Sequence, residues 1–231
     1  MSLTTGRGPL SRNPAGRFTE PVPAGVAYVE PFRRRVRGLV GERTVVDSER
    51  VVLVHRPGEP PRYAFPAADV GDGAPDVERE PAVAGYVHVP WAAIEAWYEE
   101  DERVHYHPRN PYHRVDCVPT SRQLRVELDG TVLVDTTQTL GVYETALEPR
   151  LYVRPELVRR DLLVASATTT YCPYKGTASY WTATVGDRVV EDVAWFYEDP
   201  LPESLPLGGM LCFDEAKVTL VHDLPPSAAI G

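Results

Sequence analysis

The sequence predicts a mainly β protein made of antiparallel strands, with one or two short helices, and three observations support this. Segments rich in β-branched and aromatic residues recur along the chain, and turn pairs such as Asp129-Gly130 and Gly186-Asp187, typical of tight hairpins, separate them. The chain has 23 prolines, which suit a loop-rich β protein better than a helical one. An internal repeat indicates two tandem copies of one β unit.

The repeat relates residues 36–70 to residues 124–158 at an offset of 88 residues. Seven pairs are identical, namely Arg37/Arg125, Val46/Val134, Asp47/Asp135, Val54/Val142, Pro61/Pro149, Arg62/Arg150 and Val70/Val158. Further on, Trp97-Tyr98-Glu99-Glu100 matches Phe196-Tyr197-Glu198-Asp199 at an offset of 99. The larger offset predicts an insertion of about eleven residues in the second copy, in the stretch that contains Cys172 to Gly176.

The elements follow from local composition. Nine segments have the composition of strands: 44–47, 51–55, 62–65, 124–128, 131–134, 151–153, 179–185, 189–195 and 217–221. Two helices are predicted: 91–101 follows Pro90 and would place Trp91, Ile94 and Tyr98 on one face, and 155–163 begins with Pro and Glu. Residues 71–85 have the composition of a loop.

These elements divide the chain into four predicted segments. Residues 1–30 form an N-terminal arm, 31–121 a first, degenerate copy, 122–224 a second copy with the Cys-Pro-Tyr-Lys-Gly loop, and 225–231 a tail. A chain of 231 residues with 43% hydrophobic residues has enough apolar side chains for one large core or two small ones.

The charge and the hydropathy of the chain exclude some partners. The net charge of −9 argues against nucleic acid, because binding a phosphate backbone relies on cations. The run Arg33-Arg34-Arg35 belongs to a basic N-terminal region that we interpret as an arm lying on an acidic body. No apolar run approaches the roughly 18 residues of a membrane span, and residues 1–25 lack the apolar core of a signal peptide. We therefore expect a cytoplasmic protein without a membrane partner.

Cysteine usage predicts reduced thiols. Cys117, Cys172 and Cys212 are odd in number and far apart, and no Cys-x-x-Cys pair is present. This pattern argues against a disulfide framework and against a four-cysteine zinc site. We expect no tightly bound zinc and no cofactor.

The segment Cys172-Pro173-Tyr174-Lys175-Gly176, followed by Tyr180 and Trp181, is the principal candidate site because it concentrates a thiol, an amine and three aromatic rings. In one interpretation Lys175 favours the thiolate and makes Cys172 a nucleophile or redox thiol. In a second, the segment is a ligand-binding loop in which aromatic side chains flank one cation. In a third, Cys172 packs as a small hydrophobe and the turn is structural. The aromatic residues favour the second interpretation.

A histidine-rich segment, residues 105–117, is the second candidate. Three of the six histidines lie here, and His113 is a candidate base or hydrogen-bonding group for a ligand. Alternation along a strand would place His105 and His107 on one face, as a metal site requires, but no second motif completes a ligand set. A polar loop made rigid by its prolines is the alternative.

Two repeated Pro-Arg pairs contain Arg62 and Arg150. A guanidinium that recurs in both copies can recognise a carboxylate or phosphate, or it can pair internally, Arg62 with Asp47 and Arg150 with Asp135. Arg150 and Tyr152 complete the candidate ligand-binding set, because both belong to the copy that carries the loop.

Four motifs together resemble one known family. They are Gly-Thr-Val-Leu-Val-Asp-Thr-Thr at 130–137, Glu-Pro-Arg-Leu-Tyr-Val at 148–153, Thr-Thr-x-Cys-Pro-Tyr-Lys-Gly-x-Ala-x-Tyr-Trp at 169–181, and Ala-Trp-x-Tyr-Glu-Asp-Pro at 194–200. They are similar to domain-of-unknown-function family number 427 over residues 124–223, and the first half, with residues 107–116, resembles the leading copy of two-copy members.

The resemblance implies two tandem β-tent-like units, in which two antiparallel sheets meet at an angle over a small-molecule pocket, as in methionine sulfoxide reductase B and the ligand domain of cereblon. Such relatives usually hold zinc through two cysteine pairs, which this chain lacks. The family's nucleotidyltransferase-like label has no corresponding motif here. We therefore expect a binding protein for a small molecule. The alternatives are an enzyme with Cys172, Lys175 and His113 as catalytic residues, and a scaffold that binds a protein through its basic arm.

Overall fold

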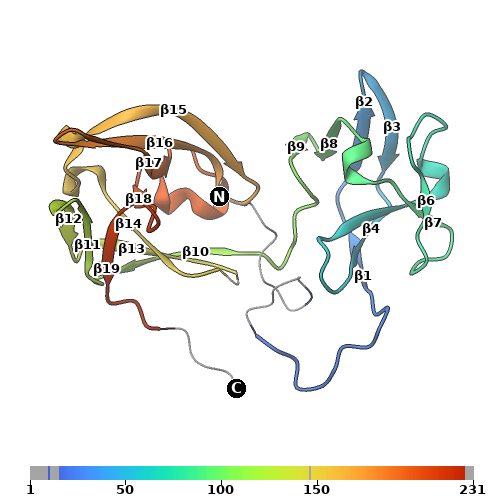
Figure 1. The fold of residues 1–231 in the computed structure, drawn as a ribbon. Helices are drawn as coiled ribbons and strands as arrows, with labels where there is room; N and C mark the ends of the chain where they lie inside the picture. The colour runs from blue at the N-terminus through green and yellow to red at the C-terminus, as the bar shows by residue number, and fades with distance from the viewer. Residues whose placement is uncertain (1–9, 11–15, 146, 227–231) are drawn as a thin grey trace. The chain divides into compact units, whose positions relative to one another are not determined.

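The computed structural model describes residue 10, residues 16–145 and residues 147–226, and these are mainly β strands in antiparallel sheets (Figure 1). The chain divides into two compact units between Tyr112 and His113, which we call the first and the second unit. The predicted mainly β class is confirmed. Residues 1–9 and 11–15 of the predicted N-terminal arm, and residues 227–231 of the predicted tail, lie outside the described residues.

The first unit contains two sheets. One has the strand order β1-β4-β5-β7-β6 and the other the order β3-β2-β8-β9. The strands are β1 (Tyr28–Phe32), β2 (Val36–Val40), β3 (Arg43–Ser48), β4 (Val51–His55), β5 (Arg62–Pro66), β6 (Glu78–Arg79), β7 (Tyr86–His88), β8 (Ala96–Glu99) and β9 (Glu102–Val104). Two 3-10 turns, η1 (Ala67–Asp69) and η2 (Trp91–Ala93), connect them. The core contains Val36, Leu53, Phe65 and Trp97, all almost fully buried.

The second unit contains three sheets, with the orders β10-β13-β14, β12-β11-β19 and β15-β16-β17-β18. The strands are β10 (Val115–Thr120), β11 (Leu124–Leu128), β12 (Thr131–Thr136), β13 (Thr139–Glu144), β14 (Arg150–Val153), β15 (Leu163–Cys172), β16 (Gly176–Val185), β17 (Arg188–Tyr197), β18 (Cys212–Phe213) and β19 (Thr219–His222). The 3-10 turns are η3 (Pro155–Leu157), η4 (Arg160–Leu162) and η5 (Pro202–Leu207). The long strands β15, β16 and β17 lie side by side (Figure 1).

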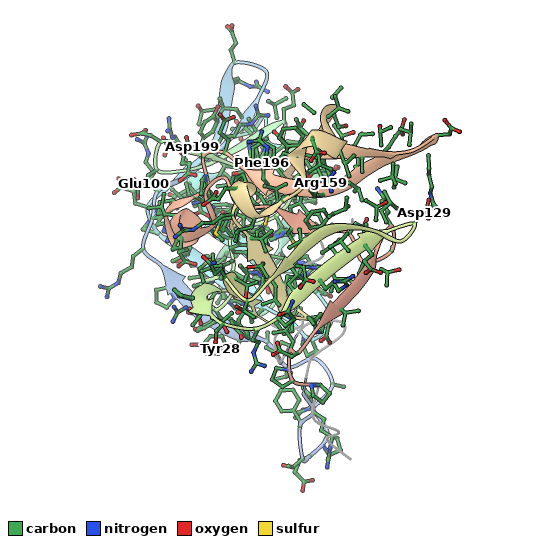
Figure 2. All side chains as sticks on the ribbon, turned by 90° about the vertical axis from the view of Figure 1, so that its left-hand side faces the viewer. Tyr28, Glu100, Asp129, Arg159, Phe196 and Asp199 are labelled. Atoms are coloured by element: carbon green, nitrogen blue, oxygen red, sulfur yellow. The ribbon has the colours of Figure 1, made fainter. Side chains whose placement is uncertain are left out.

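The two predicted hairpin turns join β11 to β12 and β16 to β17. Asp129 and Gly130 both adopt positive φ, 48° and 76°, the conformation that a tight two-residue hairpin turn requires. The ends of the two hairpins are joined by an ion pair between Arg188 and Asp129 at 2.6 Å. Figure 2 shows Asp129 at the outer end of its hairpin.

Two separate cores form in the second unit because neighbouring residues of a strand face opposite sides. The first, which we call the Val126 core, includes Val126, Leu133, Val153, Val193 and Phe213. The second, which we call the Cys172 core, includes Val115, Leu140, Tyr152, Cys172, Ala178, Trp195, Tyr197, Leu207 and Cys212.

Strand pairing in the two units matches at an offset of 88 residues. The pair Tyr28↔His55 of β1 and β4 corresponds to Asp116↔Tyr143 of β10 and β13. Two further residue pairs of the first unit also have counterparts in the second: Val52↔Ala64 corresponds to Leu140↔Tyr152, and Val36↔Ser48 corresponds to Leu124↔Thr136. The β-bulges match as well, at Gly38/Leu39 and at Val126/Glu127. Because β10 pairs with β13, it belongs with the second unit, although the sequence prediction ended the first copy at residue 121.

The predicted insertion is larger than about eleven residues. Phe65 pairs with Val87, whereas the corresponding Val153 bridges to Leu211, so the offset rises from 88 to 124, a difference of 36 residues. The extra residues include the hairpin of β15 and β16. The match of Trp97 with Phe196 is not reproduced, because β8 pairs with β2 while β17 pairs with β16. The two short motifs share an aromatic-acidic pattern but have different neighbours.

The two predicted helices form only single 3-10 turns within their predicted bounds. Residues 91–101 form the single turn η2 and then β8, in which Trp97 and Glu99 are buried with the two-residue period of a strand. Residues 155–163 form the turns η3 and η4 before β15 begins at Leu163. All nine predicted strands fall on observed strands, wholly or in part. Within the described part of the chain, no helix is long and apolar enough to cross a membrane.

Candidate functional site

Three ionisable side chains meet at one end of the Cys172 core. Nζ of Lys175 donates to Oε2 of Glu144, and Nε2 of His113 lies 2.9 Å from Oε1 of the same carboxylate. All three side chains are largely buried, with 11% of Lys175, 13% of Glu144 and 3% of His113 exposed. We call this group the Glu144 cluster. Its charged groups are mutually satisfied, which is the condition under which such groups tolerate burial.

Separate elements position these side chains. Glu144 is the last residue of β13, and it pairs with Val115, the first residue of β10, so His113 lies just beyond the paired region. The backbone continues this pairing through a hydrogen bond of 2.9 Å from the Thr145 amide to the carbonyl oxygen of Arg114. The strand register therefore brings His113 next to Glu144, although 31 residues separate them in sequence.

The Cys172–Gly176 loop is a tight turn between β15 and β16. Cys172 and Gly176 are paired across the turn, and the Lys175 amide donates to the Cys172 carbonyl oxygen at 3.3 Å. Gly176 has a φ of 97°, which strongly favours glycine. Two hydrogen bonds from the segment after β17 hold the loop in place. The Leu201 amide donates to the Lys175 carbonyl oxygen at 3.1 Å, and the Ser204 hydroxyl donates to the Tyr174 carbonyl oxygen at 3.2 Å.

Tyr174 completes the cluster by stacking on His113. The ring centroids are 3.9 Å apart and the planes are inclined by 25°. This contact and the hydrogen bond to Glu144 together restrict the rotation of the imidazole ring. The loop and the segment before β10 are therefore joined by ring stacking as well as by charge.

Glu144 is held in its charged form. Burial alone would raise the pKa of Glu144, but the hydrogen bond from His113 and the positive charge of Lys175 outweigh it and hold the pKa below its usual value. The cluster therefore contains a carboxylate that accepts from two donors on different segments.

The three cysteines are free thiols in different surroundings. Cys172 is 6% exposed and packs in the Cys172 core. Complete burial raises the pKa of Cys212 to about 12, and burial also raises the pKa of Cys117, despite the nearby charge of Lys175. These surroundings match the packing of small hydrophobic side chains.

The predicted aromatic residues divide between two faces of β16. Tyr180 packs against the Cys172 core, with its hydroxyl 2.9 Å from that of Thr170. Trp181 packs instead against the Val126 core, with Phe196 at 5.8 Å between ring centroids and the Arg160 guanidinium 5.2 Å from its ring. The structure therefore brings Tyr180 and Tyr152 to the core beside the loop but does not bring Trp181 there.

The internal pairs considered for the two arginines, Arg62 with Asp47 and Arg150 with Asp135, do not form. Arg62 forms an ion pair with Glu59, and Arg150 lies 3.7 Å from Glu215 and 5.3 Å above the ring of Trp195. The two aspartates have other partners: Asp47 pairs with Arg35, and Asp135 pairs with Arg125. Arg125 lies on β11, the strand that pairs with the strand of Asp135, and Arg35 directly precedes β2, the strand that pairs with the strand of Asp47. Tyr152 is buried in the Cys172 core and accepts a hydrogen bond from the Trp195 indole at 3.0 Å.

The histidine-rich segment does not act as one group. His105 and His107 belong to the first unit, where the buried His107 donates to the carbonyl oxygen of Pro108 at 2.7 Å. His113 belongs to the second unit and to the Glu144 cluster. Among the described residues, no group of three or more His, Cys, Asp or Glu side chains is arranged to hold a metal ion.

Glu144 is the site residue that sequence reasoning missed. It lies outside the four motifs that carry the family resemblance. The one available signal was the repeat, because Glu144 corresponds to Arg56 at the offset of 88 residues. A change from arginine to glutamate at matched positions indicates that the partner has changed as well.

A comparison with protein families finds a match, and it lies within the second unit. Residues 116–223 match the model of a domain of unknown function (DUF427). The resemblance seen over residues 124–223 is thereby confirmed. The DUF427 segment contains Glu144 and the whole Cys172–Gly176 loop, whereas His113 lies three residues before it. A comparison with curated proteins finds no match for the chain.

Proposed function

We propose that the protein binds a small molecule in its second unit, at a site formed by the Cys172–Gly176 loop and the Glu144 cluster. The observation that carries this proposal is the burial of Lys175 against Glu144 beside the stacked rings of Tyr174 and His113. An apolar core of this size does not need a buried ion pair for stability, since well-packed hydrophobic residues usually serve equally well. Groups of this kind are typical of binding sites.

The chemistry of the cluster favours a flat ligand with an anionic or strongly accepting group. An ammonium has three donor hydrogens, and Glu144 is the hydrogen-bond partner of Lys175 among the described residues. A ligand oxygen can accept from Lys175 while the ligand ring packs near Tyr174. Tyr152 and Tyr180, two of the ligand-binding residues predicted from the sequence, pack in or against the Cys172 core beside this loop.

The proposal includes the relation between the two units. The matched pairing registers support two tandem copies of one β-tent-like unit, of which the second has gained the hairpin of β15 and β16. In this proposal the matched strands are common to both copies, and the binding loop is an addition to the second copy.

Benzoate is a suitable probe because it is flat and carries one carboxylate. Amide NMR spectra of the whole chain should show shifts for Tyr174 and Gly176 on titration, and Lys175→Met should weaken the response at least about tenfold. Benzamide has the same shape without the charge and should bind more weakly. Equal responses of the wild type and the Lys175→Met variant would contradict the proposal.

An enzyme that uses Cys172 is the second candidate, favoured by the position of Lys175 in the same tight turn. Ion pairing with Glu144 offsets the charge that would stabilise a thiolate. The scaffold alternative depends on a free basic arm, but Arg34 pairs with Glu99 and Arg35 pairs with Asp47 within the first unit. These pairs occupy two arginines of the run.

A further inference from the structure

The first unit contains a pocket of about 400 Å³, lined mainly by aromatic and proline side chains. The residues on which the argument rests are Tyr63, His88, Trp91 and Trp97, with Arg62 and Glu78 as its charged members. A volume of this size lies within the range of about 300–1,000 Å³ that is typical of small-molecule sites. It belongs to the unit that the sequence predicted to be degenerate.

Three aromatic rings form a rigid wall of this pocket. The centroid of Trp97 lies 5.6 Å from that of Tyr63 and 5.5 Å from that of Trp91, and Trp91 and Trp97 are inclined by only 25°. Tyr63 and Trp97 are 3% and 2% exposed. The two buried rings hold Trp91 in place, and a fixed aromatic ring of this kind can contact a flat ligand at little entropic cost.

Hydrogen bonds hold the rings in place. The Tyr63 hydroxyl donates to Oε1 of the buried Glu99 at 2.6 Å, and the Trp97 indole donates to the carbonyl oxygen of Trp91 at 3.2 Å. Gly38 pairs with Trp97, and a Cβ at that position would come to 3.0 Å from the indole ring. Trp97 is therefore closely packed against β2, whereas the partly exposed Trp91 is accessible to solvent.

His88 supplies a polar group in the same wall. Its Nδ1 lies 3.2 Å from the carbonyl oxygen of Tyr63, and because a carbonyl oxygen can only accept, Nδ1 carries the proton. Burial lowers the pKa of His88, so the imidazole is neutral at pH 7. In this tautomer Nε2 is a hydrogen-bond acceptor.

The charged lining residues offset each other. Arg62 and Glu78, the charged residues of the lining, have opposite signs. The pocket therefore has no excess charge to attract an ion, and its aromatic wall favours a ligand that is apolar over most of its surface.

We propose that this pocket binds a neutral, flat heteroaromatic molecule whose N–H donates to Nε2 of His88 while its ring packs against Trp91 and Trp97. The site is independent of the one in the second unit, so either proposal can fail without the other. An apolar ring without a donor fits the same space but leaves the His88 acceptor without a ligand partner.

Indole and benzofuran provide a matched test, because the two rings have nearly the same shape and only indole has an N–H. Calorimetry with the full chain should show that indole binds about fivefold more tightly than benzofuran. Trp91→Ala should weaken both ligands by about tenfold. Tyr143→Ala, which removes an exposed ring from the second unit, is the control and should leave both affinities unchanged.

His88→Asn tests the hydrogen bond separately. The asparagine amide can still donate to the Tyr63 carbonyl oxygen, but it lacks the acceptor at the position of Nε2. Indole affinity should fall to that of benzofuran, and benzofuran affinity should stay the same. Absence of indole binding to the wild type, equal binding of the two rings, or unchanged affinity in a folded Trp91→Ala variant would overturn the proposal.

Discussion

The two units place opposite charges at matched positions. In the first unit Arg56 directly follows β4 and forms an ion pair with the buried Glu80. In the second unit Glu144 ends the corresponding strand β13 and pairs with Lys175 and His113. Each unit therefore has a largely buried ion pair at the end of the matched strand, β4 or β13. The residue at the strand end is positively charged in the first unit and negatively charged in the second.

The source of the partner differs as well. Glu80 lies just after β6 in the first unit, whereas Lys175 lies in the loop between β15 and β16, a hairpin with no counterpart among the described residues of the first unit. The matched strand positions therefore hold opposite charges, and in each unit a later segment supplies the complementary charge. In the second unit the hairpin of β15 and β16 carries both that complement and Cys172.

Loss of the Lys175 amine should have the largest effect on stability. Lys175→Met leaves Glu144 largely buried with His113 as its one remaining partner in the cluster, so we expect the second unit to lose about 3 kcal/mol of unfolding free energy. Urea denaturation followed by a probe in the second unit measures this loss. Arg188→Met is the control, because Arg188 pairs with Asp129 while both side chains are about half exposed, and it should cost under about 1 kcal/mol. Equal losses in the two variants would show that the cluster has no special role.

Arg56→Met makes the equivalent change in the first unit. We expect a loss of about 2 kcal/mol, since Glu80 keeps a hydrogen bond of 2.9 Å from the Ala82 amide. The loss should affect unfolding of the first unit and leave that of the second unchanged, as residue-resolved hydrogen exchange can measure. A loss shared by both units would contradict the view that each pair stabilises only its own unit.

Acid should weaken both units for the same reason. The pKa values of Glu80 and Glu144 are both lowered by their partners, against the opposing effect of burial. Each contributes stability that is fully present above the unfolded-state pKa of about 4.3 and is lost as the pH falls through the folded-state pKa. Glu144→Gln should flatten this part of the pH profile for the second unit only. An unchanged profile would mean that the pKa of Glu144 is the same in the folded and the unfolded protein.

The smallest expected effect concerns the thiols. Because Cys172 is buried and Glu144 pairs with Lys175, we expect iodoacetamide to label Cys172 no faster than the more exposed Cys117, and Lys175→Met to leave the Cys172 rate unchanged. Mass spectrometry of the native protein at several times provides the rates. Faster labelling of Cys172, with a decrease in Lys175→Met, would favour the enzyme alternative.

Local patterns predicted the strands well because alternation and hairpin turns are properties of short segments. Asp129-Gly130 identified its hairpin, and β11 and β12 lie where their composition indicates. The helix predicted at 91–101 failed because Trp91, Ile94 and Tyr98 have helical spacing by coincidence, while pairing with β2 decides the conformation of β8.

The candidate site was harder to predict than the fold. Lys175 and His113 carry recognisable chemistry, but Glu144, which joins them, became identifiable only through the strand register. Trp181 was misplaced for a reason that the sequence contains: it follows Tyr180 directly on a strand, and adjacent strand residues face opposite sides. The aromatic pocket of the first unit depends on segments far apart in sequence, and no local pattern indicates it.

Gly38 accounts for a difference between the cores of the two units. It pairs with Trp97, and the corresponding Val126 pairs with Leu220. In the second unit the larger strand residue and the smaller partner fill an ordinary core, whereas in the first unit the missing side chain makes room for an indole. A methyl group at residue 38 would come to 3.0 Å from that ring, so the indole would have to shift by a few tenths of an ångström. The missing side chain on β2 thus leaves space for a ring that lines the pocket of the first unit.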